Sequence, residues 1–556
     1  MYPSPLLLSA GIPPAPSTTV GVVELIMVSL VVVAILMVLA RKWQIPYPVL
    51  LVIGGLGLSF APGLPKLNLD PELIFVFFLP PLLYPAALFT SWRDFSAELR
   101  PILLLAIGLV FFTILVTALF AHAFIGMALG SAFVLGAIIS PSDAVAATAI
   151  SHRLRVPRRI VTILEGESLV NDTSAFVAYR FGVVAVVTGS FSLADASFKF
   201  VLVGLGGIVV GLAFGFIATS IHRRMDDPPV QITLSLLTPF ATYLAAEALG
   251  TSGVLAVVVC GLYNGWRSPE VINSRTRLKA GPVWEQVGFI LNGLIFILIG
   301  LQLPEVVQSL DGNSLAGHSL GQAIVYALLI IVLVIVIRLV WTVVVTYVPR
   351  ALSRKIRRDY PAPPWQEVVL IGWTGMRGAD SLAAALALPL ATANGTAFPD
   401  RGLIFFLTFS VIFGTLVLQG LSMQPVIRWL NLEEDHSAEK EERHARLTAN
   451  RAALSRICEL HQVRPVKPNT LQRLKLEYED RIRQLESETA ANGATGVSLY
   501  SSEYEELSQQ ALDAEREMII KLRNNRAIND EVLRRIQLDI DLAEARLGHD
   551  ETDETS

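Results

Sequence analysis

Residues 165–176, EGESLVNDTSAF, concentrate carboxylates at the start of an otherwise apolar stretch. Ser168 and Asp172 are four residues apart, so on a helix they share one face and offer a hydroxyl and a carboxylate together. Hard oxygen ligands of this kind suit small cations. Asn171 adds an amide beside the carboxylate, whereas Glu165 fits a first helical turn, where the helix dipole favours an acid. The pattern therefore indicates a cation site at Asp172.

A second polar segment, GAIISPSDAVAATAI, carries Pro141, Ser142 and Asp143 at its centre. Pro141 lacks a backbone donor and disfavours helix in the residue before it. A simple kink is the usual outcome for a lone proline in an apolar helix. The hydroxyl and the carboxylate at this proline favour instead an unwound segment, whose freed carbonyls coordinate a cation.

A third segment, GWTGMRGADSLAAALALP, places a cation in an apolar run. Three glycines flank Arg377 and predict a second interrupted helix: Gly372, Gly375 and Gly378. Arg377 requires a buried anion, and Glu167 is one candidate. Asp380 is another candidate, and it equally fits the role of a cap on the second half-helix. Two broken helices in corresponding halves of a chain are typical of an inverted-repeat transporter.

The elements that must position these residues are apolar. The chain has 556 residues, of which 53% are hydrophobic and 17% charged, whereas soluble domains carry about 25% charged residues. Repeated apolar runs predict an all-α polytopic membrane protein. The two broken helices, which we expect to be crossing helices, indicate inverted repeats. We expect about thirteen transmembrane helices, near residues 20–40, 46–62, 70–90, 101–121, 129–150, 162–187, 198–221, 230–248, 251–265, 282–303, 320–348, 365–388 and 402–429.

Charge divides the chain into regions. From Glu433 onward there are 18 Lys and Arg against 27 Asp and Glu, whereas the preceding residues carry a net charge of +5. We expect an extracytoplasmic segment at 1–19, a transmembrane domain at 20–432 and a cytoplasmic helical tail at 433–556. The predicted loops alternate, with nineteen basic residues in one set and three in the other, which places the N-terminus outside the cell. The tail is either a solvated helical hairpin or a regulatory element.

Four segments resemble the sodium/proton exchangers of the monovalent cation:proton antiporter-1 family, especially its long bacterial members: FLPPLLYPAAL, SPSDAVAA, EGESLVND and GMRGADSLA. Their order and spacing match over about residues 20–430, including the 29 residues that separate Asp143 from Asp172. A single such motif is weak support, but four in register are specific. The resemblance implies inverted repeats, a dimerisation domain and a mobile core domain that moves like an elevator.

The resemblance also implies a cation- and proton-binding set, headed by the carboxylate that carries either ion: Asp172, Asn171, Ser168, Asp143 and Ser142. It implies that the transported Na⁺ is bound by Asp172, Asp143 and Ser168, and that Glu167 and Arg377 form a buried ion pair. The chain departs from the family pattern at Ala144, where many relatives have proline, and at Pro85, where several have an acid. Asp380 stands where many relatives are apolar, and is a candidate modulator of ion preference or pH response.

We therefore expect a secondary transporter of the cell inner (plasma) membrane that exchanges a monovalent cation for H⁺. Na⁺ is the first candidate, with K⁺ and Li⁺ as others. Electroneutral exchange is expected because Asn171 does not titrate, whereas electrogenic relatives have a second aspartate there. We expect a homodimer in contact with membrane lipids, no nucleic-acid partner, no enzymatic activity, and no cofactor besides the transported Na⁺ and H⁺.

Three other functions fit parts of the pattern. A cation channel lines a continuous pore with rings of charge or carbonyls, usually from several subunits, whereas one carboxylate between two broken helices favours alternating access. A K⁺-selective proton antiporter would use the same residues. An intramembrane aspartyl protease needs two membrane aspartates, but the chain has PSDAV and LVNDT at Asp143 and Asp172 and no Gly-x-Gly-Asp sequence.

Overall fold

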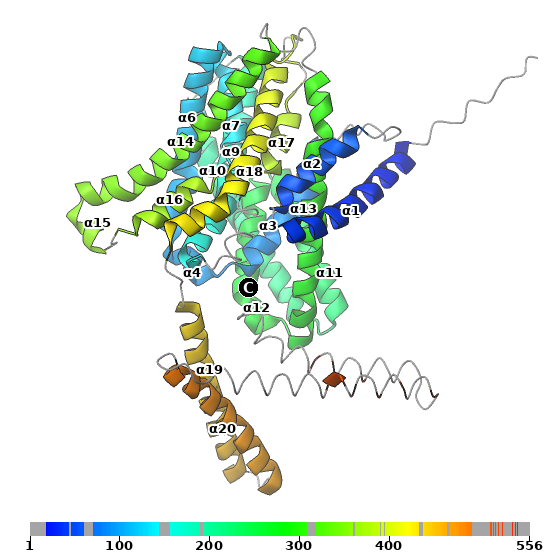
Figure 1. Cartoon of the computed structure of the whole chain (residues 1–556), viewed down its shortest axis with the longest axis vertical. Helices are drawn as coiled ribbons and strands as arrows, with labels where there is room; N and C mark the ends of the chain where they lie inside the picture. The colour runs from blue at the N-terminus through cyan, green and yellow to red at the C-terminus, as the bar shows by residue number, and fades with distance from the viewer. Residues whose placement is uncertain are drawn as a thin grey trace, which may run out of the picture. The chain divides into compact units, whose positions relative to one another are not determined.

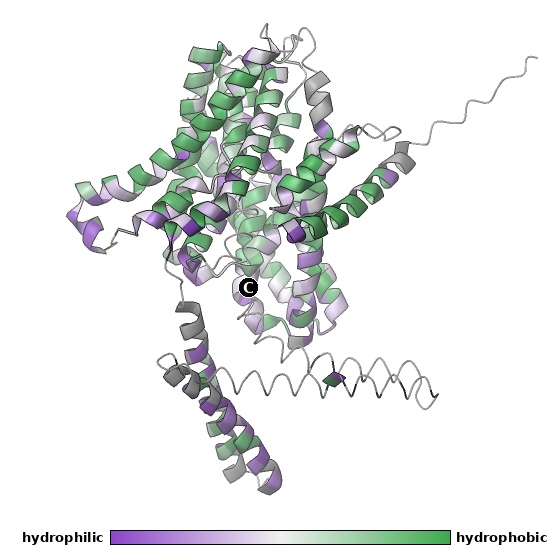
Figure 2. Ribbon diagram, viewed as in Figure 1, coloured by the Kyte–Doolittle hydropathy of each residue, from purple (hydrophilic) through white to green (hydrophobic). Residues whose placement is uncertain are grey.

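The computed structural model divides the chain into two compact units, residues 1–433 and 434–556. The described residues are helical apart from connecting segments and one isolated bridge between Ala391 and Ala397. Apolar residues dominate the helices of the first unit, whereas α19 and α20 of the second are mostly polar (Figure 2). The structure describes residues 18–43, 46–60, 71–143, 156–189, 193–308, 319–359, 362–389, 391–393, 395–432, 437–463 and 468–491, and single positions between 512 and 542.

The first unit is a bundle of helices (Figure 1). Its elements are α1 (Thr18–Trp43), α2 (Tyr47–Ser59), α3 (Pro71–Phe89), α4 (Trp92–Ala97), α5 (Leu99–Leu103), the π-helix η1 (Leu104–Leu109), α6 (Val110–Phe120), the π-helix η2 (Ala121–Ile125), α7 (Leu129–Ile139), α9 (Arg158–Thr188), α10 (Leu193–His222), α11 (Pro228–Ala248), α12 (Gly253–Val271), α13 (Ser274–Gln308), α14 (Leu320–Leu352), α15 (Arg354–Asp359), α16 (Trp365–Trp373), α17 (Ala379–Leu386) and α18 (Arg401–Leu430).

The helices coincide with the ranges expected to cross the membrane. Each of the thirteen ranges overlaps at least one helix, although residues 144–150 of the fifth lie outside the described part of the chain. Six described helical stretches are long and apolar enough to cross a bilayer: Val23–Trp43, Leu99–Ile125, Ser197–His222, Arg275–Gln302, Gly321–Leu352 and Arg401–Leu430. Three shorter apolar helices accompany them, Tyr47–Ser59, Val76–Phe89 and Leu129–Ile139. The chain is therefore a multi-pass membrane protein.

Of the two predicted helix interruptions, the second is described in full, whereas residues 144–150 after the first lie outside the described part of the chain. Helix α7 ends at Ile139, and residues 140–143 are not helical. Helix α16 ends at Trp373, and α17 begins only after the extended segment 374–378. The proline in the first segment and the glycines in the second account for these breaks, because proline removes a helical hydrogen bond and glycine weakens a helix.

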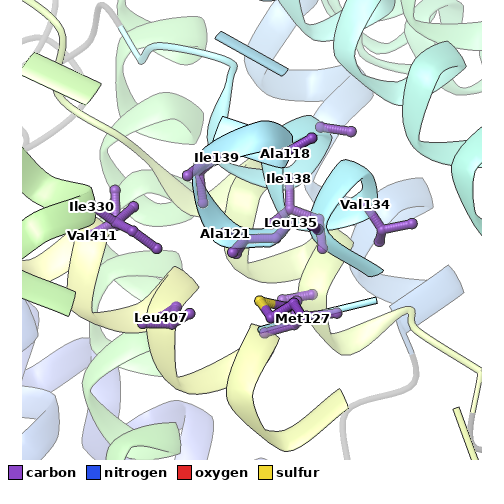
Figure 3. Packing of buried hydrophobic residues seen from close by; sticks show 14 of the residues in the cluster. Ala118, Ala121, Met127, Val134, Leu135, Ile138, Ile139, Ile330, Leu407 and Val411 are labelled. Carbon is purple, nitrogen blue, oxygen red and sulfur yellow. The ribbon is translucent and has the colours of Figure 1, made fainter. Parts of the chain in front are cut away.

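Two groups of helices have separate apolar cores. One core joins α6, α7, α9, α14, α17 and α18, with Leu135, Ile138, Ile330 and Leu407 at its centre (Figure 3). Another joins α3, α11, α12 and α13 around Tyr84, Val257 and Trp284. A third cluster packs α2 and α13 against α9, α16, α17 and α18. Helices α7 and α17 belong to the first group, whereas α16 packs mainly in the third cluster.

Helices α2 and α13 approach each other closely at a pair of glycines. A Cβ atom on Gly300 would lie 2.1 Å from the Val52 carbonyl oxygen, and one on Gly55 would lie 2.2 Å from the Ile297 carbonyl oxygen. Backbone atoms cannot move aside as a flexible side chain does, so this contact requires residues without Cβ. Gly57, also on α2, has no neighbour within 4 Å of such a position.

The second unit contains α19 (Ser437–Val463) and α20 (Pro468–Ala491). The two helices pack on each other, and the Arg451 guanidinium lies 2.7 Å from the Glu486 carboxylate. Both partners are about half exposed, so this pair adds little to stability.

The glycine contact predicts opposite effects for two Gly→Ala substitutions. Gly300→Ala should lower the melting temperature of the purified protein in detergent, because the added methyl group forces α2 and α13 apart at a cost of about 1–3 kcal/mol. Gly57→Ala is the matched control, and should leave stability unchanged or raise it by roughly 0.5–1 kcal/mol through helix propensity. Equal melting temperatures for both variants would contradict the close contact.

Candidate functional site

The two unwound segments, 140–143 and 374–378, lie against each other. The backbone N–H of Asp143 donates to the Met376 carbonyl oxygen at 2.8 Å. A Cβ atom on Gly378 would lie 2.3 Å from Asp143 Oδ2, so the Asp143 carboxylate packs directly on the Gly378 backbone. The absence of a side chain at Gly378 therefore permits the first segment to place its carboxylate at the start of α17.

Side chains of helix α9 form hydrogen bonds with the first unwound segment. Asn171 Nδ2 donates to the carbonyl oxygen of Ser142 at 2.9 Å and to its Oγ at 3.0 Å. Ser142 Oγ in turn donates to Glu167 Oε1 at 2.7 Å. All three side chains are buried. Asn171 Nδ2 and Ser142 Oγ thus hold the unwound backbone against α9, whereas Asn171 Oδ1 has no hydrogen-bond partner among the described residues.

Asp172 projects from the same helix and is 2% exposed. Its carboxyl group lies within hydrogen-bonding reach of the carboxyl group of Asp380, and both interact electrostatically with Asp143. Two carboxyl groups hydrogen-bond to each other only when one carries a proton, because the ionised forms repel. Ser168 lies one turn before Asp172 on α9 and is half-buried. The carboxylates come from three separate elements.

Asp380 fills neither of the roles that its position in the sequence predicted. Gly378 is the N-cap residue of α17, and Asp380 lies within the first turn of that helix, where the dipole favours an acid. The contact that the structure gives its carboxyl group is with Asp172, not with Arg377. This contact was not predicted from the sequence. It joins residues 208 positions apart, on two helices whose packing no local pattern specifies.

The predicted ion pair between Glu167 and Arg377 needs correction, because Arg338 is the partner of Glu167. Arg338 NH1 and NH2 donate to the two carboxylate oxygens of Glu167 at 2.5 and 2.8 Å. The side chains are 1% and 2% exposed. Arg338 also donates from Nε to the Ile371 carbonyl oxygen at 3.1 Å and from NH1 to Ser142 Oγ at 3.3 Å.

Arg377 is buried in the second unwound segment. Its backbone N–H donates to Thr415 Oγ1 at 3.2 Å, whereas its side-chain Nε and NH1 are buried with no hydrogen-bond partner among the described residues. The sequence did hold a signal for the correct pair. Arg338 stands alone in the apolar run IIVLVIVIRLVWTVVV, and a cation in such a position requires an anion.

The ion pair predicts unequal effects when each arginine is removed. Arg338→Gln leaves Glu167 as an uncompensated buried charge and should destabilise the protein by roughly 3–5 kcal/mol. Arg377→Gln should lower the melting temperature by less, because no hydrogen bond of its Nε or NH1 is lost. The double variant Arg338→Gln with Glu167→Gln is the control and should recover part of the loss. A larger effect of Arg377→Gln would show that Glu167 relies on Arg377.

Known proteins resemble this chain over most of its length. The family model described as sodium/hydrogen exchanger, transmembrane, matches residues 27–429. The chain is 35% identical to a Na⁺/H⁺ exchanger of Mycobacterium tuberculosis over 92% of its own length and 93% of the relative's. It is 34% identical to the Na⁺/H⁺ antiporter ApNhaP of Aphanothece halophytica, covering 86% and 87% of the two chains.

A Bacillus pumilus protein named sodium, potassium, lithium and rubidium/H⁺ antiporter is 39% identical over 67% of this chain and 56% of that protein. Among solved structures, the sodium proton antiporter MjNhaP1 of Methanocaldococcus jannaschii matches with a TM-score of 0.59 at 19% identity, over 75% of this chain and 99% of that one. At this level of identity, the similarity concerns the fold alone. The family model and the relatives show that the chain belongs to the sodium/hydrogen exchangers of the monovalent cation:proton antiporter-1 family.

Proposed function

We propose that the chain exchanges Na⁺ for H⁺ across the cell inner membrane, and that Asp172 binds either ion in turn. The observation that carries the proposal is the position of Asp172. It is a buried carboxyl group on α9, in contact with Asp380 and facing Asp143 where two unwound segments meet. The names of the relatives, Na⁺/H⁺ exchangers and antiporters, support the same ions.

Oxygen atoms from separate elements supply the proposed cation ligands. Asp172 and Asp143 provide carboxylates, and Ser168 provides a hydroxyl one turn away on α9. Ser142 and Asn171 act through position, because their hydrogen bonds hold the unwound segment that carries Asp143. Asp380 is a further proposed ligand, at a position where many relatives have an apolar residue. Its carboxyl group lies within hydrogen-bonding reach of Asp172.

Competition for one site makes the exchange obligatory. A proton or a cation at Asp172 offsets the carboxylate charge, and an uncompensated charge is costly to move through an apolar barrier. The site therefore moves when loaded and stays when empty. We propose an elevator motion, in which the group containing α7, α9, α14, α17 and α18 moves against the group of α3, α11, α12 and α13. Each group has an apolar core, and the motion would shift the further clusters that join α9 to α3 and α12 and to α13.

The carboxyl pair favours one proton for one cation. Asp172 and Asp380 share one proton when they are hydrogen-bonded, so together they carry a charge of −1. Loss of that proton and binding of one monovalent cation leaves the charge of the site unchanged. Asn171 does not titrate, and its amide is hydrogen-bonded to Ser142. We therefore propose electroneutral exchange.

We also propose how the chain is oriented in the membrane and how it assembles. The concentration of basic residues in one set of loops favours an extracytoplasmic N-terminus and a cytoplasmic unit from residue 434 onward. We propose a homodimer with one ion site in each copy. The Bacillus relative is named for four cations, so K⁺ and Li⁺ belong in any assay beside Na⁺. A K⁺-selective antiporter is the alternative that such an assay would reveal.

Asp172→Asn should abolish exchange while leaving a folded protein, because an amide cannot alternate between a proton and a cation. The measurement is the pH change inside proteoliposomes after addition of Na⁺, K⁺ or Li⁺, which should fall to the level of empty liposomes. Asp480→Asn in the exposed part of α20 is the matched control and should exchange as the parent does. Parental rates in Asp172→Asn would refute the role of this carboxyl group.

Electroneutral exchange predicts that turnover does not respond to voltage. At fixed ion gradients, proteoliposomes held at an inside-negative and then an inside-positive potential should show the same rate and the same reversal point. Asp380→Asn tests the origin of this balance, since it removes one carboxyl group of the shared pair. A reversal point that moves with voltage in the parent protein, and no longer moves in Asp380→Asn, would show that Asp380 carries a second proton.

A further inference from the structure

Two cavities adjoin outside the site described above. The first has a volume of about 820 Å³ and lies between α4, α5, η1 and α9 on one side and α10 and α12 on the other. The second has a volume of about 530 Å³ and is enclosed by the ends of α3, α10, α11, α12 and α13. Trp92 and Trp266 line both cavities. The two cavities therefore adjoin at these tryptophans.

The larger cavity is apolar. Most of its lining consists of carbon side chains, among them Leu103, Phe200, Leu205, Leu212 and Leu262. Val201 and Leu205 on its wall are 55% and 59% exposed, so the cavity opens toward the lipid that surrounds α10. Cavities of about 300–1,000 Å³ with apolar walls hold small lipophilic ligands. In a bilayer, the lipophilic group at highest concentration is the acyl chain of a phospholipid.

The walls of the smaller cavity are mainly apolar but include basic side chains. Arg93, Arg267, Arg277 and His222 line it, and Arg267 NH1 also donates to the Glu270 carboxylate at 2.9 Å. The Arg267 guanidinium lies 4.4 Å from the centre of the Trp266 ring, which holds it at the border between the cavities. Basic pockets between transmembrane helices bind the head groups of anionic lipids. Tryptophans are also typical of the level where head groups meet acyl chains.

Three buried polar atoms on the wall of this cavity have no partner within the described protein: His222 Nδ1, Gln231 Oε1 and Thr276 Oγ1. Their side chains are 7%, 1% and 2% exposed. Buried polar atoms in folded proteins almost always have a hydrogen-bond partner, so these three leave hydrogen-bonding capacity beside the cavity for a bound polar group or water. The hydroxyl of Thr276 and the ring of His222 are able to donate to phosphate oxygens, and Gln231 Oε1 accepts from a hydroxyl.

We propose that these cavities bind one anionic phospholipid, with its phosphate in the basic cavity and an acyl chain in the apolar one. The chain passes between the two cavities at Trp92 and Trp266. A soluble phosphate would use only the basic cavity, and an uncharged lipophile only the apolar one. Thr173, Ser174 and Val177 line the apolar cavity on α9, so the bound chain packs on the helix that carries Asp172.

Lipid binding at this site is separate from ion exchange, and the test measures lipid binding alone. The full-length protein, freed of lipid in detergent, is mixed with dioleoyl phosphatidylglycerol and analysed by native mass spectrometry. Dioleoyl phosphatidylcholine is the probe with equal chains and no net charge, and glycerol 3-phosphate is the head group without a chain. Wild type should retain phosphatidylglycerol in preference to phosphatidylcholine, and glycerol 3-phosphate should bind weakly.

Two variants separate the head group from the chain. Arg267→Gln with Arg277→Gln should reduce the preference for phosphatidylglycerol by roughly five-fold per arginine. Gly204→Leu should remove binding of both lipids, because Gly204 lines the apolar cavity and its Cβ position has no neighbour within 4 Å, so a leucine projects into the space. Gly57→Leu on α2, equally open but distant from the cavities, is the matched control and should bind as wild type does.

Two outcomes would overturn the proposal. Equal retention of phosphatidylglycerol in wild type and in both cavity variants would show that the lipid binds elsewhere on the surface. Binding of glycerol 3-phosphate as strong as that of phosphatidylglycerol would identify a soluble anion as the ligand. Neither outcome bears on exchange by Asp172, and loss of exchange in Asp172→Asn leaves lipid binding unaffected.

Discussion

The rest of the site depends on the buried ion pair between Glu167 and Arg338. A carboxylate and a guanidinium that are almost completely excluded from solvent are tolerated only when they are paired and further hydrogen-bonded. Here the pair is bidentate, and Arg338 also contacts the Ile371 carbonyl while Ser142 contacts both charged groups. This network joins α9, α14, the end of α16 and the segment that follows α7. It therefore determines where the first unwound segment lies.

The second constraint is the close approach of the two unwound segments. Gly375 lies against Arg338, where a Cβ atom would be 2.5 Å from Cδ, and Gly378 lies against the Asp143 carboxylate. Both glycines therefore serve two purposes, because they interrupt the helix and leave room for the charged groups of other elements. Larger residues at either position would displace Arg338 or Asp143. In this way the interruption of α16 and α17 is coupled to the ion pair.

Local patterns predicted the helices and their breaks, because proline, glycine and apolar runs act over a few residues. The interruption at 374–378 follows from the glycines around Arg377, and the end of α7 follows from Pro141. The partners of Glu167 and Asp172 did not follow from such patterns. Arg338 lies 171 residues from Glu167, and which buried arginine reaches the carboxylate depends on the packing of α14 on α16 and α9. The composition of the site was thus predictable, but its pairing was not.

The charges of the buried centre explain why its pairing matters for the proposed exchange. Glu167 and Arg338 cancel each other, so the remaining charged groups of the centre are Arg377, Asp143 and the pair of Asp172 and Asp380. With one shared proton, these groups carry a net charge of −1, and with one cation in place of that proton the charge is the same. Without either ion it becomes −2. The two loaded states therefore present the same charge to the surrounding helices, and the empty state alone carries the extra cost of desolvating a second negative charge. The observed pairing leaves the positive charge of Arg377 in the same segment as Gly378, which packs on Asp143. The broken helix itself thus carries this buried cation, which interacts electrostatically with Glu167 and Arg338.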